Sequence, residues 1–280
     1  MTRFILNADD YALTAGISKG IVALAQAGRL SATSAMVNMP RWPDTAPAAV
    51  ALRDRIALGL HLNLTFGAPL GPMPNFAPSG EMPVIGVVIR RALGGTLPDV
   101  ELHAEIGRQL DRFEEVTGVP PDFVDGHHHV HALPGIRRAL LAEMRRRFPA
   151  GGPLLRDSAD RSSKILRRRV AAPKALVVAA LTAGFGRQAR AAGFALNDSF
   201  AGFSTFGNMP YAAEFEMFLL APGDRAMIMC HPGLADGEPA GHDPIAHRRT
   251  EEQDFLAGRE GLPELLWHPN RAAGTRGFPW

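Results

Sequence analysis

The chain has 280 residues, of which 46% are hydrophobic and 21% charged, and a net charge of +2. This composition is typical of a globular protein with a substantial core. The single cysteine, Cys230, excludes an internal disulfide and fits a reducing compartment. The N-terminal sequence MTRFILNADD lacks the pattern of a signal peptide, and no apolar run reaches the roughly 18 residues of a membrane span. We therefore expect a cytoplasmic protein.

Short apolar runs alternate with segments of helical period, which is the pattern of βα units around a parallel sheet or barrel. The expected strands are Arg3–Ala8, Ala32–Asn38, Ile56–Leu64, Asp122–Gly126, Pro153–Arg156 and Ala226–Cys230. The expected helices are Ala15–Ala27, Val100–Thr117, Ile136–Phe148 and Lys174–Ala192. Proline and glycine predict a loop over Pro69–Pro83. We expect one α/β domain over residues 1–280, a distorted TIM-like (β/α) barrel with a loosely ordered tail at 268–280.

Carboxylates and imidazoles follow four of the expected strands. Asp9 and Asp10 follow FILNA, His61 ends IALGL, Asp125 opens the motif DGHHHVH, and His231 follows AMIMC. The carboxyl ends of barrel strands meet at one face, so these side chains are expected to converge there. Two adjacent carboxylates repel each other unless a cation or a shared proton relieves them. The pattern predicts a metal site.

Ligand type indicates which metal this site would hold. Two imidazoles and one carboxylate suit Zn²⁺ or another first-row divalent ion, and three protein ligands leave positions open for water and substrate. Such a site is catalytic rather than structural. Taken singly, His61 is more typical of a structural histidine, and DGHHHVH could equally be a surface loop.

Charge is concentrated between residues 137 and 190, where fourteen Lys or Arg stand against three acids and give a net charge of +11. One interpretation is the solvated outer faces of helices. The other is a surface that binds anionic phospholipid headgroups. Nucleic acid is disfavoured as a partner, because interleaved aromatics and recognisable nucleic-acid motifs are absent from the segment.

Four strings carry a family resemblance. In this order and spacing, LNADDYAL, GLHLNLT, DGHHHVH and MCHPG resemble the YdjC-type (ChbG-like) carbohydrate deacetylases, whose (β/α) barrel is related to NodB-type polysaccharide deacetylases. The segment FALNDSFAGFSTFGNM and the basic, apolar helix before it are most similar to the hopanoid biosynthesis-associated branch, HpnK.

The resemblance implies a role for each motif residue. It makes Asp10, His61 and His127 the metal ligands, Asp9 the catalytic base and His231 the general acid. The ligand types place Zn²⁺ first, and Mg²⁺ is the alternative because it is often the metal assigned to the family.

Further residues are expected to support this group. Asp125 falls where a carboxylate orients a metal-bound imidazole. If the motif is extended, His129 points the same way as His127 and is the alternative ligand. Arg156 is expected to bind a substrate oxygen or orient Asp9, with a structural salt bridge as the other reading. Three aromatic residues could stack on a sugar or line a lipid groove, although core packing is the more typical role of each: Trp42, Phe203 and Phe206.

The implied reaction is metal-dependent hydrolysis of an N-acetyl group to acetate and a free amine. The HpnK-like features indicate N-acetylglucosaminyl bacteriohopanetetrol, a hopanoid lipid, as substrate, with residues 137–190 against the inner face of the cytoplasmic membrane. The alternatives are a deacetylase of soluble chito-oligosaccharides and a non-catalytic sugar- or lipid-binding protein of the same fold. A metal-dependent phosphoesterase is less favoured, because it usually needs a second metal and more carboxylates.

Overall fold

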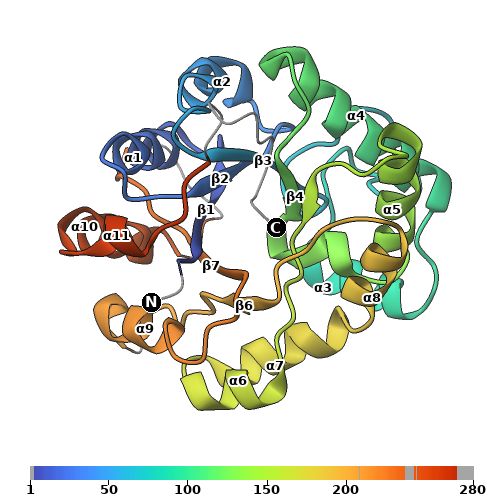
Figure 1. Cartoon of the computed structure of the whole chain (residues 1–280). Coiled ribbons are helices and arrows are strands. Elements are labelled where there is room, and N and C mark those ends of the chain that lie inside the picture. The colour runs from blue at the N-terminus through green and yellow to red at the C-terminus, as the bar shows by residue number, and fades with distance from the viewer. Residues whose placement is uncertain (1–2, 208, 237–242, 244, 270–280) are drawn as a thin grey trace.

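Seven parallel strands in one sheet form the centre of the molecule, and helices surround them (Figure 1). The computed structural model describes residues 3–207, 209–236, 243 and 245–269. The strands are β1 Ile5–Tyr11, β2 Ala32–Ala35, β3 Ala57–Leu62, β4 Phe123–Gly126, β5 Leu154–Leu155, β6 Ser199–Ala201 and β7 Ala226–Cys230. Their order across the sheet is β5-β4-β3-β2-β1-β7-β6.

The sheet curls into a barrel that is incomplete between its edge strands, β5 and β6. An isolated bridge between Leu155 and Leu196 and a hydrogen bond from the Leu155 N–H to the Ala195 carbonyl link the β5 edge to the chain that leads into β6, where no continuous ladder forms among the described residues. The expected distorted α/β barrel is therefore confirmed.

The helices cover the outside of the sheet. They are α1 Ala15–Gln26, α2 Trp42–Val50, α3 Ile85–Leu93, α4 Asp99–Thr117, α5 Ile136–Arg147, α6 Ser162–Arg168, α7 Ala172–Leu181, α8 Phe185–Ala191, α9 Tyr211–Phe218, α10 Ala246–Gly258 and α11 Leu262–Leu265, with the 3₁₀ turn η1 at His127–Ala132. None of the helices in the described ranges is long and apolar enough to cross a membrane.

Strand alternation divides the core into two parts. Ile5 of β1 packs inside the barrel with Ala32, Phe123 and Met227 from neighbouring strands, whereas Leu6 packs outward against the helices. Because side chains alternate along a strand, Asn7 and Asp9 share the inward face of Ile5. The strand order and this alternation together aim Asp9 into the barrel.

Most predicted elements lie within a few residues of the observed ones, and Ala226–Cys230 is reproduced as β7. The single helix expected at Lys174–Ala192 is wrong. The chain forms α7 and α8 instead, separated at Gly184, whose φ of +87° breaks the helical path. The three-residue strand β6 was missed, because so short a run gives no periodic signal.

Two segments were predicted to lack regular secondary structure, Pro69–Pro83 and the tail at 268–280. Pro69–Pro83 contains no helix or strand, as predicted. The expected tail, apart from His268 and Pro269, lies outside the described residues.

An apolar cavity of about 160 Å³ lies at the amino ends of β1, β6 and β7. Its walls include Phe4, Phe218, Met227 and Leu265. None of the predicted site residues lines it, so the chemistry must be sought at the opposite, carboxyl ends of the strands.

Candidate active site

A bulge in β1 brings Asp9 and Asp10 to the same side of the barrel. The two residues lie inside the strand, not after it as expected, and the register with β2 shifts between Ala8 and Tyr11. Regular alternation would send Asp10 outward. Instead Asp10 has a left-handed φ of +69°, a strained backbone for a residue with a side chain. Both carboxylates consequently face His61, at 4.0 Å for Asp9 and 3.2 Å for Asp10.

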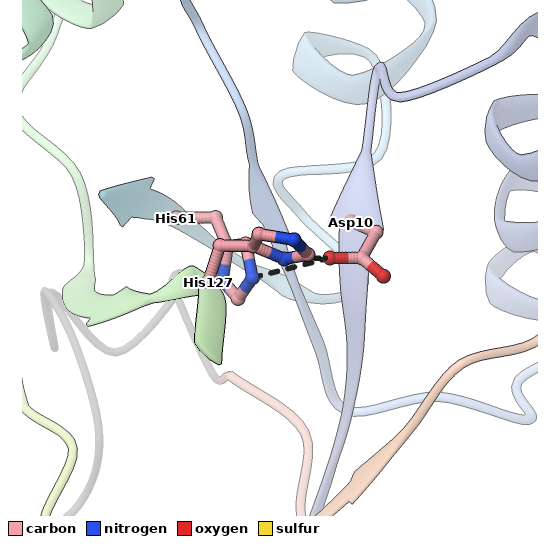
Figure 2. Close-up of side chains that lie close together, drawn as sticks. All are labelled: Asp10, His61 and His127. Atoms are coloured by element: carbon pink, nitrogen blue, oxygen red, sulfur yellow. Dashed lines mark hydrogen bonds and ion pairs between the residues drawn. The ribbon is translucent and has the colours of Figure 1, made fainter. Parts of the chain in front are cut away.

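Three predicted ligands come together at this point (Figure 2). Asp10 Oδ1 lies 3.2 Å from His61 Nε2 and 3.0 Å from His127 Nδ1, and the three donor atoms are all within 4.8 Å of one another. Zn²⁺ bonds of about 2.0–2.2 Å place neighbouring donors about 3 Å apart. The group could therefore hold a divalent ion, and its two nitrogens and one oxygen are a typical zinc donor set.

Arginine controls the charge and orientation of Asp10. Arg249, on α10, donates to Asp10 Oδ2 at 2.7 Å and to Asp243 at 2.6 Å. Although burial alone would raise it, the pKa of Asp10 is held well below its usual range by Arg249 and His127. Asp10 is therefore ionised, with one oxygen held by arginine and the other directed at the imidazoles.

Asp125 orients His61 from the neighbouring strand. The two residues are register partners on β3 and β4, and His61 Nδ1 lies 2.7 Å from Asp125 Oδ1. Ser34 on β2 also donates to Asp125, at 3.0 Å. Although burial alone would lower it, the carboxylates of Asp125 and Asp9 raise the pKa of His61 to about 10. This is the contact by which a carboxylate fixes a metal-binding imidazole.

Arg156 lies between Asp9 and Asp125 and is fully buried. Its Nη1 is 2.8 and 2.9 Å from the two Asp9 oxygens and 2.6 Å from Asp125. Asn7 adds a 2.6 Å hydrogen bond to Asp9. Burial nevertheless raises the pKa of Asp9 against the opposing effect of Arg156. Of the roles expected for Arg156, these contacts fit both orientation of Asp9 and a salt bridge.

The motif DGHHHVH is not extended, so the argument for His129 as an alternative ligand is wrong. Asp125 and Gly126 end β4, and the histidines form η1, in which His128 and His129 both have left-handed backbones, with φ of +53° and +60°. Alternation is lost in such a turn, and the His129 ring packs edge-on against Phe203 at 5.3 Å. Two groups among the described residues could hold a metal ion, Asp10 with His61 and His127, and Asp9 with His61 and Asp125, and His129 belongs to neither.

The other two histidines of the motif also bond elsewhere. His128 Nδ1 lies 2.9 Å from the hydroxyl of Thr65, and His131 Nε2 lies 2.7 Å from the carbonyl of Arg156. His127 is thus the motif histidine that meets Asp10.

His231 follows β7, on the opposite side of β1 from His127. Its backbone N–H donates to Glu252 at 2.6 Å, and its Nδ1 is buried without a hydrogen-bond partner among the described residues. Burial lowers the pKa of His231 to about 3. The imidazole is therefore neutral at rest and has a nitrogen available for a ligand.

Sequence reasoning missed three residues that hold this group together: Arg249, Asn7 and Ser34. Arg249 carries no motif signal, because it lies 239 positions from Asp10 and is one of many helical arginines. Asn7 lies within the string LNADDYAL, two positions before Asp9, but the motif gave it no role. The proposal that Trp42 stacks on sugar is wrong. Trp42 is fully buried and stacks on Phe113 in the core, at 5.9 Å between ring centroids.

Comparison with known proteins agrees with this geometry. Residues 3–262 match the model of the YdjC-like protein family, and the chain belongs to that family. It is 32% identical to a chitooligosaccharide deacetylase from Serratia marcescens over 260 residues, 90% of this chain and 89% of the relative. It is 39% identical to a chitooligosaccharide deacetylase from Enterobacter sp. (strain 638), over 47% of this chain and 51% of that relative.

A solved structure shares the whole fold. It is a protein from Enterococcus faecalis V583 described as a candidate cellobiose-phosphate cleavage protein. The two structures superpose with a TM-score of 0.73 at 19% identity, covering 97% of this chain and 98% of the other. The family match confirms the YdjC resemblance of the four sequence motifs, and the superposition confirms the fold.

Proposed function

We propose that this protein is a metal-dependent deacetylase that hydrolyses the N-acetyl group of chito-oligosaccharides. The observation that carries the proposal is the convergence of Asp10, His61 and His127 beside an Asp9 carboxylate that is buried and held by Arg156. The names of the relatives supply the substrate class, and they favour soluble chito-oligosaccharides over the hopanoid lipid expected first.

The reaction needs help at both ends of the amide bond. When bound, a divalent ion makes water a better nucleophile and the acetyl carbonyl a better electrophile. Asp10, His61 and His127 would hold the ion, with zinc as the first choice by donor type and magnesium as the alternative. Asp125 fixes the His61 ring, and Arg249 keeps one Asp10 oxygen occupied so that the other faces the site.

Asp9 serves as the base in this proposal. Its raised pKa suits a group that must take a proton from water as the C–O bond forms, and Arg156 holds both of its oxygens in place. Burial and the arginine contact oppose each other, which keeps the carboxylate available without making it strongly basic.

His231 serves as the acid that donates a proton to the leaving nitrogen as the C–N bond breaks. Because the imidazole is neutral at rest, it must be protonated after the substrate binds. In this proposal, the proton that Asp9 removes from water is the one that protonates His231. The products are then acetate and a free amino sugar, with the water proton on the nitrogen.

Acetate release from diacetylchitobiose by metal-replete protein tests this function. We expect turnover that disappears on chelation and returns with Zn²⁺ or Mg²⁺, whichever ion the protein retains. Metal-replete protein that binds the disaccharide but releases no acetate would contradict the proposal. A protein that releases acetate equally well after chelation would contradict its metal dependence.

A lipid-linked amino sugar is the second candidate, and α6 and α7 favour it. Of the α7 residues, only Ala175 is buried, while Leu166 on α6 and Val177 on α7 are 57% and 58% exposed. Arg161 and Arg167 are exposed beside them. An apolar surface with basic neighbours is suited to an anionic bilayer.

The basic segment 137–190 does not form one surface, however. Arg156 lies in the site and Arg168 is buried against Asp160, so the candidate membrane surface contracts to α6 and α7. Incubation with N-acetylglucosaminyl bacteriohopanetetrol, in parallel with diacetylchitobiose, compares the two substrates directly. The HpnK-like assignment requires faster acetate release from the lipid.

A further inference from the structure

Two half-buried aromatic rings border the candidate site. Phe66, after β3, presents a ring whose centroid is 6.4 Å from that of His127. Phe206, in the loop between β6 and α9, presents a ring 6.2 Å from that of His231, with the planes inclined by 71°. Since β4 and β7 lie on opposite sides of β1 in the sheet order, the two rings mark opposite borders.

The backbone holds Phe206 in an unfavourable conformation. Its φ of +54° is left-handed, a region that a residue with a bulky side chain rarely occupies. The Phe206 N–H donates to Ser204 Oγ at 2.9 Å, and its carbonyl accepts from His247 Nε2 at 3.1 Å. Strain of this kind persists only where surrounding contacts enforce it, and it is concentrated at functional sites.

A cation also contacts the Phe206 ring. Lys174 Nζ, on α7, lies 4.0 Å from the centroid of the Phe206 ring, a distance typical of a cation–π contact. Phe203, another aromatic residue of the same loop, differs because it is buried against His129. Phe206 is therefore the aromatic of this loop that borders His231.

The chemistry of the leaving group indicates what this ring contacts. In the proposed reaction, His231 must come within hydrogen-bond distance of the amide nitrogen, about 3 Å. The pyranose carbon that carries this nitrogen is one covalent bond further away. The sugar ring must consequently lie beside the aromatic ring that borders His231, and the C–H face of a pyranose is apolar enough to pack on it.

We propose that Phe206 is the sugar-binding platform of this site and determines affinity for the pyranose that carries the N-acetyl group. Lys174 is a positioning residue that holds the Phe206 ring. The inference deepens the proposed function and rests on it, because it uses the role given there to His231.

The test combines direct binding with kinetics on metal-replete protein. Calorimetry with chitobiose, which has no acetyl group, measures sugar binding without turnover, while acetate release from diacetylchitobiose gives kcat and KM. For Phe206→Ala we expect chitobiose affinity to fall and KM to rise, each by about tenfold, with kcat changed by less than about twofold. Phe206→Tyr and Phe206→Trp should restore both.

Lys174 requires its own comparison. Lys174→Gln should weaken binding by a smaller factor, about threefold, and Lys174→Arg should restore it, because arginine also packs on aromatic faces. Arg167→Gln is the matched control. It removes one positive charge from the same basic segment, and Arg167 is exposed on α6.

The possible outcomes distinguish failure of the Phe206 platform from failure of the proposed deacetylase function. Wild-type protein that binds chitobiose but releases no acetate contradicts the proposed function, and loss of that binding in Phe206→Ala still supports the platform. Phe206→Ala protein that folds, keeps its metal and binds chitobiose as wild type does overturns the platform, whatever the acetate assay shows. Wild-type protein that binds neither sugar overturns both.

Discussion

The side chains at the carboxyl ends of β1, β3 and β4 differ from those on helices α6 and α7 in burial and in their contacts. At the strand ends, Asp9, Asp10, His61 and Asp125 are each no more than 2% exposed, and each contacts another member of the group. On α6, Arg167 and Leu166 are both exposed to solvent, and so is Val177 on α7.

This difference indicates which substitutions should have large effects on function. A buried charge is tolerated only when it is paired, so Arg156 and Arg249 are as necessary to the strand-end group as its carboxylates. Surface charges on α6 and α7 are screened by water and individually contribute little. Substitutions at the strand ends should therefore act strongly, and substitutions of exposed charges such as Arg161 and Arg167 weakly.

The largest effect is expected for His61→Ala, which should lose both metal and turnover. The change removes the donor Nε2 and leaves Asp125 without its imidazole partner. Metal content after gel filtration and acetate release measure the two losses. His128→Ala is the matched control, since His128 is outside the donor group and should keep the metal. Metal retained by His61→Ala would remove this residue from the site.

Asp9→Asn should separate binding from catalysis. An amide cannot take the proton from water, so we expect turnover to fall by about 10³-fold, while the ion stays bound because Asp9 is not among the Asp10, His61 and His127 donors. Metal analysis and acetate release on the same preparation show whether the variant keeps its metal while it loses turnover. A rate near that of wild type would exclude Asp9 as the base.

Arg249→Gln should weaken metal binding by about 10- to 100-fold, the range found for residues that orient metal ligands. The variant leaves Asp10 Oδ2 without its charged partner, so the carboxylate is no longer held toward the imidazoles. Competition with a chromogenic chelator gives the affinity. Arg259→Gln, which disrupts a surface pair with Glu216, is the control and should bind metal normally.

Metal binding should release about one proton per ion near neutral pH. His61 is charged there because its pKa is raised to about 10, and an imidazole must be neutral to ligate a metal. The sign follows: affinity rises as the pH increases and levels off above the His61 pKa. Calorimetry in buffers of different ionisation heat counts the protons, and binding heats independent of the buffer would contradict the prediction.

The smallest effect on chemistry is expected on α6. Replacing Arg161, Lys164 and Arg167 together by glutamine should change acetate release from diacetylchitobiose by less than about twofold. Cosedimentation with anionic vesicles should fall by about 100-fold if these side chains contact lipid, at about 1 kcal/mol for each charge. If wild-type protein does not bind anionic vesicles, the proposed membrane surface is contradicted, while the proposed reaction is unaffected.

Much of the site was accessible from sequence because parallel strands impose a common direction. Once short apolar runs are recognised as strands of one barrel, the residues that follow them must share an end, whatever their separation in the chain. This argument placed Asp10, His61 and the histidines of DGHHHVH at one end of the barrel, and the family resemblance then selected His127 among them and suggested the roles.

The remainder depended on backbone conformations that no pattern signals. The left-handed φ of Asp10 turns its carboxylate back into the barrel, against the alternation that the sequence alone predicts. The same conformation at His128 and His129 folds the histidine motif into a turn and removes the extended geometry on which the alternative ligand His129 was predicted. Each is a single residue's choice, stabilised by contacts from distant segments.

The sequence by itself determined the barrel, the family and the set of residues available for chemistry, because periodicity and motif spacing are local properties of the chain. Only the tertiary structure decided which partners hold those residues. Arg249 reaches Asp10 from α10, and Arg156 joins Asp9 to Asp125 across the barrel. Buried charges select their partners by proximity in space, and that proximity exists only after the strands have assembled.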